Sequence, residues 1–253
     1  MINIQRLNMD SSWWLRWGDT SILIDPWLLG SEVDGFSWLN EQWHATPAVA
    51  LDKIPSYQFI IISQPYSDHC HAVTLQQLNA VPVYAVPPAY RRLKKELKST
   101  ELNILSNKEL EWTNVGELRI ARLTPKKLFD PIYHALLIVR NEEAILYAPH
   151  GFKLRSDQLN LLEGLTVKLL LTSFAYFKIP AIMGGLVNPG TEGAFALMKQ
   201  VNPQNVLNTH DEDKRGKGLV LQLAKRLYPD MNKEASMNKS ITALFDYREI
   251  SLS

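Results

Sequence analysis

The stretch IISQPYSDHCHAVTL, residues 61–75, places Asp68, two histidines and the only cysteine of the chain in four consecutive positions. A hydrophobic run precedes these residues and a helix-like pattern follows them, which puts them just beyond an expected strand, Gln58–Ser63. Functional sites in layered α/β folds gather beyond the carboxyl ends of strands. Three interpretations are open: a metal site, a Cys70 nucleophile with a histidine base, or a helix cap formed by Asp68.

Two more histidines stand in the same local context. His150 follows an expected strand, Ala144–Tyr147, and His210 follows another, Val206–Asn208. Side chains at such strand ends can converge although they are far apart in the sequence. Imidazole and carboxylate together suit zinc, iron or manganese. The metal site is therefore favoured, because neither a cap nor a thiolate explains the two distant histidines.

The rest of the chain predicts alternating hairpins, strands and helices, which favours a layered α/β fold with two mixed sheets and helices outside. The first hairpin is expected to pair Ser12–Trp17 with Ser21–Ile24 across a Gly18-Asp19 turn. The expected helices lie at Thr74–Asn79, in PPAYRRLKKELKS from residue 87, around Leu154–Glu163, after Pro189-Gly190, and at Lys217–Tyr228. No repeat or shift in composition divides the chain, so one domain over residues 1–253 is expected.

Composition excludes several classes of protein. The chain has 253 residues and a net charge of +1, which gives no reason to expect nucleic acid or an anionic membrane as a partner. A single cysteine fits a reducing compartment, and neither a secretory signal nor an apolar run of membrane-spanning length is present in the sequence. A cytoplasmic protein acting on a small molecule is expected, and its oligomeric state is left open.

Four segments, in this order and spacing, resemble the metallo-β-lactamase superfamily: SILIDPWL (21–28), ISQPYSDHCH (62–71), ILYAPHG (145–151) and VLNTHDED (206–213). The resemblance covers nearly the whole chain, roughly residues 4–245. It implies a four-layer αββα sandwich, with the metal site at the edge between the two sheets.

The chain departs from the family in the residues of the first metal site. The family's His-x-His-x-Asp-His motif falls on Gln64, Tyr66, Asp68 and His69, so both leading histidines are missing. A third histidine of that site falls in RLTPKK (122–127), where Pro125, Lys126 or Lys127 stands instead. The resemblance thus implies that the first site is lost, while Asp68, His69 and His210 of the second site are kept.

The family's bridging aspartate falls on His150. A bridging carboxylate joins two cations, whereas a single cation needs only a terminal ligand, which a neutral imidazole can provide. We therefore expect one divalent ion, zinc first and iron or manganese as alternatives, bound by Asp68, His69, His150 and His210. A divalent ion with one carboxylate ligand gives the site a net charge of +1, which is still enough to lower the pKa of a bound water molecule. A relic pocket and a closed structural site are the alternatives.

The implied activity is hydrolysis, in which metal-activated water attacks an ester, an amide or a phosphoester. Asp68 is the expected catalytic residue, since it would bind the metal and orient the water. Tyr66 and a lysine (Lys126, Lys127 or Lys214) are placed to stabilise negative charge. The expected substrate-binding residues are Gln64, Tyr66, Lys126, Gly184 and Gly185.

Gly184 and Gly185 are included because SFAYFKIPAIMGGLVNPG (173–190) can shape a pocket and offer backbone N–H groups to an anion. Of the other histidines, His71 is expected to support the ligands, His134 is expected to be structural, and His44 has no assigned role. The competing function is a non-catalytic binding module on the same fold, with a relic metal pocket.

Overall fold

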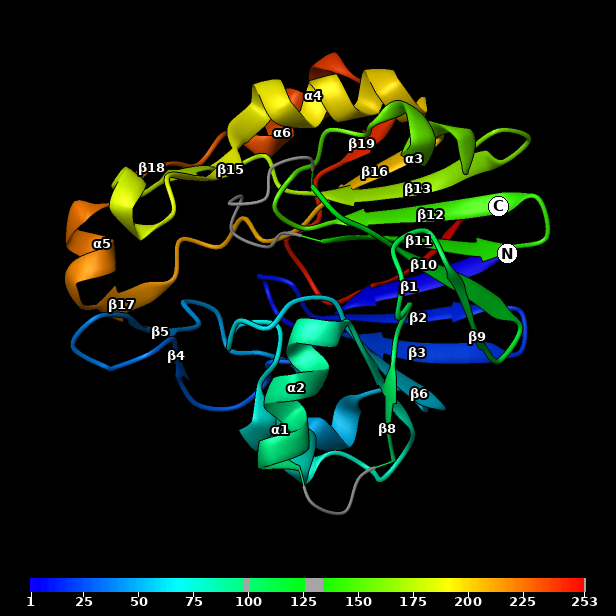
Figure 1. Cartoon of the computed structure of the whole chain (residues 1–253). Coiled ribbons are helices and arrows are strands. Elements are labelled where there is room, and N and C mark those ends of the chain that lie inside the picture. Colours follow the sequence, from blue (N-terminus) through cyan, green and yellow to red (C-terminus); the bar gives the residue numbers. More distant parts are fainter. Residues whose placement is uncertain (98–100, 126–133, 253) are drawn as a thin grey trace.

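The computed structural model of the protein describes residues 1–97, 101–125 and 134–252. Within these ranges, two seven-stranded sheets pack face to face, with α1 and α2 outside one sheet and α4 and α6 outside the other (Figure 1). The predicted αββα sandwich is confirmed. None of the helices within the described residues combines the length and the hydrophobicity that a transmembrane helix needs.

The first large sheet carries the opening hairpin and the strand before the Asp-His motif. Its strands, in spatial order, are β20 (Glu249–Leu252), β1 (Ile2–Arg6), β2 (Trp13–Trp17), β3 (Thr20–Ile24), β6 (Phe59–Ile62), β7 (Val83–Ala85) and β8 (Leu102–Ile104). β2 and β3 form the predicted hairpin, whereas β3, β6, β7 and β8 run parallel. The outer face is covered by α1 (Ala72–Gln77) and α2 (Pro87–Glu96).

The second large sheet carries the strands that precede His150 and His210. Its order is β19 (Ile241–Thr242), β16 (Asn205–Asn208), β13 (Thr166–Thr172), β12 (Glu143–Ala148), β11 (Ala135–Arg140), β10 (Leu118–Leu123) and β9 (Trp112–Val115). β12, β13 and β16 are parallel, so their carboxyl ends share one edge. The helices on this side are α3 (Ser156–Asn160), α4 (Gly190–Val201) and α6 (Met231–Met237).

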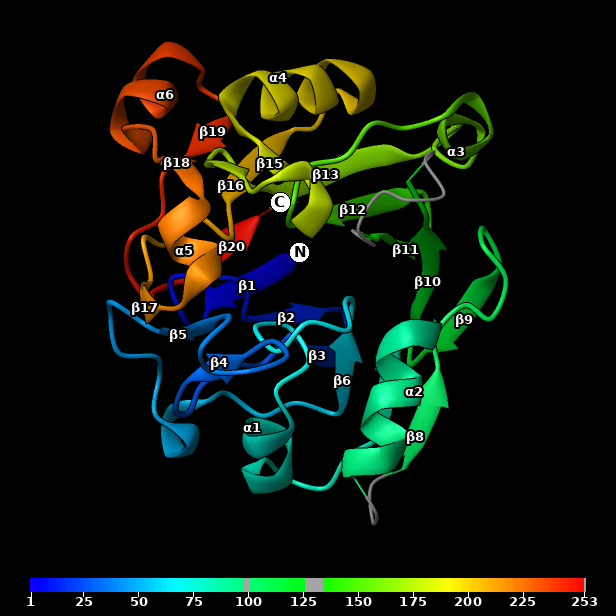
Figure 2. The same ribbon diagram turned by 60° about the vertical axis from the view of Figure 1, so that its left-hand side comes forward.

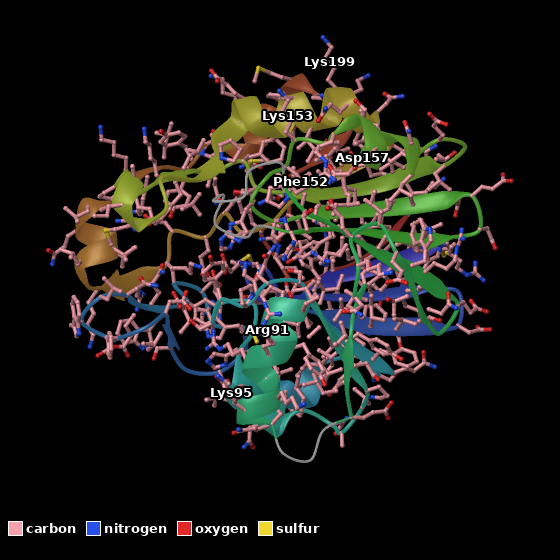
Figure 3. All side chains as sticks on the ribbon, in the orientation of Figure 1. Arg91, Lys95, Phe152, Lys153, Asp157 and Lys199 are labelled. Carbon is pink, nitrogen blue, oxygen red and sulfur yellow. The ribbon has the colours of Figure 1, made fainter. Side chains whose placement is uncertain are left out.

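Large aromatic residues fill part of the core between the two sheets. Trp13, Trp17 and Tyr147 are fully buried there. The clustered tryptophans of the N-terminal region thus serve mainly to pack the sheets, each burying a large apolar surface. Outside the core, Arg91 and Lys95 of α2 and Lys199 of α4 point to solvent (Figure 3), so the basic face of α2 is a solvated one.

Two small sheets stand beyond the edge where the strand ends meet. One joins β4 (Glu32–Val33), β5 (Glu41–Trp43) and β17 (Arg215–Lys217), and the other joins β14 (Tyr176–Lys178), β15 (Leu186–Pro189) and β18 (Lys225–Leu227). Figure 2 shows α5 (Leu219–Leu223) between β17 and β18. Two short 3-10 turns, η1 (Leu51–Lys53) and η2 (Ala181–Met183), complete the described elements.

The predicted helix Lys217–Tyr228 is wrong. The segment is strand, one short helix and strand again, because β17 pairs with β5 and β18 pairs with β14. Gly218 separates β17 from α5 at φ +110°, and a Cβ there would lie 2.5 Å from the Leu39 carbonyl oxygen. Pairing with distant strands thus overrides the helical period, and only a glycine permits the approach. The helix around Leu154–Glu163 shortens to α3.

Gly116 marks a point where the two large sheets touch. It follows β9 at φ +59°, and a Cβ there would lie 2.4 Å from the Thr20 hydroxyl oxygen of β3. We expect Gly116→Ala to lower the free energy of unfolding by about 3 kcal/mol, combining backbone strain with overpacking. The matched control is Gly30→Ala, since Gly30 has φ +62° but open space around it. It should lose only about 1 kcal/mol. Equal losses in urea denaturation would contradict a steric contact between the sheets.

Candidate metal centre

Three histidines from both large sheets meet at the shared edge. His69 follows β6, His150 follows β12 and His210 follows β16, as predicted from their places in the sequence. One ring nitrogen of each lies within 4.8 Å of the others, and all three residues are buried. Their ring centroids are 4.4–5.3 Å apart. The predicted convergence of the three histidines is therefore present.

The Nδ1 atom of each imidazole lies close to a side-chain oxygen. The Nδ1 of His69 lies 2.8 Å from Asp25 Oδ2, that of His150 lies 2.9 Å from Asn188 Oδ1, and that of His210 lies 2.7 Å from Asp10 Oδ1. The hydrogen-bonding acceptors of His69 and His150 place a proton on Nδ1 and leave the Nε2 lone pair for a metal ion, whereas Asp10 lies beside His210 Nδ1 as a close carboxylate without hydrogen-bond geometry. Histidine ligands in metalloproteins are oriented in this way.

The orientation of the Asn188 amide is fixed by a chain of hydrogen bonds. Asn188 Nδ2 donates to Ser173 Oγ at 3.2 Å, and that hydroxyl donates to Asp211 Oδ1 at 2.6 Å. Asp211 in turn accepts from the backbone N–H groups of Phe174 and Ala175. Because the amide nitrogen is committed to Ser173, the amide oxygen must face His150, which sets the tautomer of that ring.

The Nε2 atoms face one another across a short gap. His69 Nε2 and His150 Nε2 are 3.0 Å apart. Burial opposes protonation of His69, but the carboxylates of Asp68 and Asp25 outweigh it and raise its pKa to about 9. Burial and the neighbouring His210 and His69 lower the pKa of His150 well below its usual range. Two lone pairs at this distance repel unless a cation lies between them, so the donors fit a metal ion or a shared proton.

Asp68 adds a carboxylate beside the histidines. Its Oδ1 lies 3.8 Å from His69 Nε2 and its Oδ2 lies 3.8 Å from His210 Nε2. Burial raises the pKa of Asp68, but the charges of Lys214, His69 and His210 prevail and lower it. An ionised carboxylate and three oriented imidazoles form a donor set suited to a divalent ion of the zinc type.

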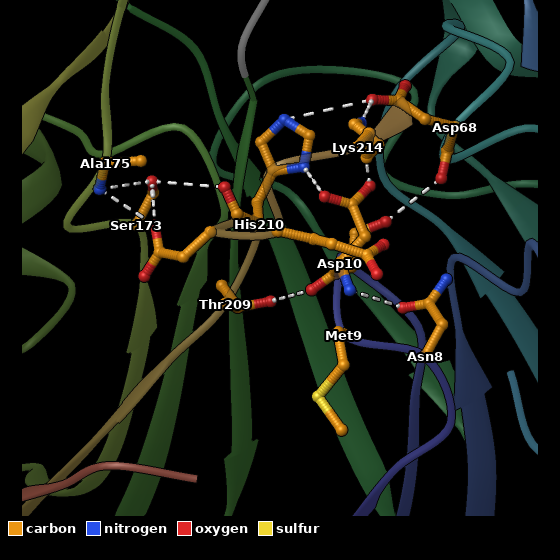
Figure 4. Close-up of polar contacts among 12 residues, drawn as sticks. Asn8, Met9, Asp10, Asp68, Ser173, Ala175, Thr209, His210 and Lys214 are labelled. Atoms are coloured by element: carbon orange, nitrogen blue, oxygen red, sulfur yellow. Dashed lines mark hydrogen bonds and ion pairs between the residues drawn. The ribbon is translucent and has the colours of Figure 1, made fainter. Parts of the chain in front are cut away.

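Lys214 and Asp10 form the other side of the centre (Figure 4). Lys214 Nζ lies 3.0 Å from Asp10 Oδ2 and 3.2 Å from Asp68 Oδ2. Burial disfavours its charge, but the two carboxylates raise its pKa above the usual value. Of the three lysines named from the sequence, Lys214 is thus at the site, whereas Lys126 and Lys127 lie outside the described residues.

A cavity of about 220 Å³ opens onto His150, His210 and Asp68, whereas His69 is fully buried behind them. Its walls are mostly apolar and come from the two small sheets and the segments around them. The apolar and aromatic lining residues are Leu39, Tyr66, Ala175, Phe177, Ile179, Met183, Val187, Val220 and Tyr228. Asp34 and Glu212 add acidic groups to the lining. The shape and the lining are those of a small-molecule site.

Of the expected substrate-binding residues, Tyr66 lines this cavity, and burial raises its pKa to about 12. Gln64 is directed elsewhere, since its side-chain amide bonds both the carbonyl and the N–H of His134. Gly184 and Gly185 are also away from the lining, and their N–H groups bond the Ala181 and Pro180 carbonyls. The structure therefore brings only Tyr66 of these four to the site.

The other polar residues of the opening stretch have local roles. His71, not Asp68, caps α1, accepting from Thr74 N at 3.2 Å, and it does not contact Asp68. Cys70 is buried, and burial raises the pKa of its thiol to about 12, so it is no nucleophile. His44, which had no assigned role, contacts Glu212 and the Trp27 carbonyl.

The supporting residues Asp10, Asp25 and Asn188 were missed in the sequence. Asp25 stands directly after a strand, in the same position as the expected ligands, and that signal alone could have identified it. Asp10 and Asn188 lie in segments without a regular pattern, where no spacing indicates which side chain turns inward.

Known proteins show the same fold. The sequence matches the profile of the Beta-lactamase superfamily domain over residues 7–210. No curated protein sequence gives a match. A possible metal-dependent hydrolase from Veillonella parvula superimposes with a TM-score of 0.70 at 12% identity, covering 98% of both chains.

Two further structures are similarly distant in sequence. Igni18, a metallo hydrolase from Ignicoccus hospitalis, has a TM-score of 0.66 at 14% identity and covers 99% of this chain and 98% of its own. An isothiocyanate hydrolase from Delia radicum gut bacteria has a TM-score of 0.66 at 14% identity and covers 99% of this chain and 100% of its own. At such identities the likeness establishes the fold.

The Asn188 amide can be tested as an orienting group. We expect Asn188→Leu to weaken divalent-metal binding about 10- to 100-fold, because His150 loses the acceptor that fixes its tautomer. The measurement is titration calorimetry with Zn²⁺ in the presence of a competing chelator. Asn205→Ala is the control, since the Asn205 amide bonds the Lys168 carbonyl instead. Unchanged affinity in Asn188→Leu would show that its amide does not orient His150.

Proposed function

Because the chain belongs to the metallo-β-lactamase superfamily, we propose that it is a metal-dependent hydrolase with a single divalent ion. The ion would be held by Asp68, His69, His150 and His210. The observation that carries the proposal is that one ring nitrogen of each histidine lies within 4.8 Å of the others, while each Nδ1 lies 2.7–2.9 Å from a side-chain oxygen. A purely structural cluster of histidines does not need this common orientation.

A bound divalent ion would supply Lewis acidity, lowering the pKa of water and polarising a carbonyl oxygen. Three nitrogen ligands and one carboxylate favour zinc, with iron or manganese as alternatives. The remaining chemistry belongs to side chains of this protein.

Asp68 suits the role of orienting water. Its pKa is lowered, so it stays ionised and accepts a hydrogen bond without retaining the proton. Tyr66 suits the opposite role, since its raised pKa keeps the hydroxyl protonated and able to donate toward developing negative charge. Both residues line the same cavity, so both can reach one substrate.

The charges of the cavity favour a neutral acyl substrate over a phosphoester. Among the described lining residues, Lys214 is the one lysine or arginine, and two carboxylates already neutralise it. Asp34 and Glu212 would repel an anion. The apolar walls suit a small uncharged ester, amide or related electrophile.

The test is metal analysis followed by assays on generic substrates. Protein purified without an affinity tag should contain about one equivalent of zinc, iron or manganese. It should hydrolyse 4-nitrophenyl acetate or phenyl isothiocyanate faster than bis(4-nitrophenyl) phosphate; the isothiocyanate is included because a protein of similar fold is an isothiocyanate hydrolase. His210→Ala should lose the metal and at least about 100-fold in rate, because one ligand is gone.

His71→Asn is the matched control, since asparagine also caps helices and His71 lies outside the donor set. It should keep both metal and activity. If no stoichiometric metal is found, and added metal restores no activity, the hydrolase proposal is wrong and a binding module on this fold takes its place.

A further inference from the structure

The ammonium group of Lys214 is enclosed by acidic side chains. It lies between the carboxylates of Asp10 and Asp68, at 3.0 Å and 3.2 Å, and the lysine side chain is only 9% exposed. The face of Trp27 lies 5.4 Å from Nζ and adds a third favourable contact. This arrangement differs from a surface ion pair, because every partner is buried.

The groups around this ammonium also match those of a metal site. One ligand atom from each of Asp10, Asp68 and His210 lies within 4.8 Å of the others. Carboxylates are donors that divalent ions accept, and Asp10 and Asp68 supply two of them, whereas His210 is assigned to the histidine site. The ammonium of Lys214 contacts two of these three residues, so it fills the position that a second ion would take.

Asp68 connects this position to the three histidines. Its Oδ1 lies 3.8 Å from His69 Nε2, and its Oδ2 lies 3.2 Å from Lys214 Nζ and 3.8 Å from His210 Nε2. The carboxylate therefore contacts both the proposed metal site and the ammonium, and it links the two positions.

We propose that Lys214 is a built-in cation that fills a second cation site formed by Asp10 and Asp68, and that it limits the centre to one metal ion. The inference rests on the proposed function, since it needs the histidine site to bind metal. Removing the ammonium leaves the buried carboxylates of Asp10 and Asp68 with one positive charge fewer, which favours capture of a divalent ion.

The experiment counts Mn²⁺ by equilibrium dialysis and examines the bound ions by electron paramagnetic resonance. Wild type should bind one equivalent. Lys214→Ala should bind two, a twofold increase in metal content, with the spin-coupled signal of neighbouring ions. Lys214→Ala combined with Asp10→Ala should return to one equivalent, bound less tightly than in wild type, because the second site then lacks a carboxylate and His210 loses its Asp10 partner.

Lys217→Ala is the matched control, since Lys217 is exposed and pairs with Glu41 at the surface. It should bind one equivalent. If Lys214→Ala does not fold alone, it is refolded with propylammonium chloride, which replaces the missing ammonium, and Mn²⁺ is titrated against that salt. Displacement of the propylammonium ion, with two equivalents of Mn²⁺ bound, supports the proposal.

The outcomes separate the two proposals. Two equivalents in wild type, or one equivalent in Lys214→Ala, would overturn the built-in cation while leaving the hydrolase proposal intact. Absence of metal from wild type would remove the proposed metal site, and this inference with it.

Discussion

The architecture depends on the buried carboxylate of Asp25. It accepts hydrogen bonds from Ser63 N at 2.7 Å, from Tyr147 Oη at 2.8 Å and from His69 Nδ1 at 2.8 Å. These donors come from the ends of β6 and β12 and from the loop after β6. One carboxylate therefore ties the two large sheets together and orients a proposed ligand. An isolated charge could not remain in this core, whereas a fully hydrogen-bonded one can.

A histidine at position 150 fits this electrostatic setting. Asp10, Asp25 and Asp68 already place three acids within or behind the centre. A fourth carboxylate beside them would require a second cation to offset its charge. A neutral imidazole, bonded to the uncharged Asn188 amide, adds a ligand without adding charge. Lys214 offsets part of the remaining acid from the opposite side.

Much of the fold and half of the site could be predicted from the sequence. The β2–β3 hairpin and β12 have strong alternating or apolar patterns, and three histidines at strand ends indicated where those ends meet. Lys217–Tyr228 was mistaken for a helix because pairing with β5 and β14 is invisible in a local pattern. Gln64 was expected to bind substrate, yet its amide bonds the backbone of His134. Position in a motif predicts the place of a residue better than the direction of its side chain.

The walls of the cavity are built from elements other than those that carry the donor groups. The histidines stand at the ends of long central strands, whereas the apolar walls come largely from two three-stranded sheets and a five-residue helix attached at the rim. Mutations in these rim elements, other than at Asn188 of β15, can reshape the cavity while the core and the three histidines keep their places. The protein thus separates the part that would carry out the chemistry from the part that would select the substrate, so that a change of substrate needs no new fold.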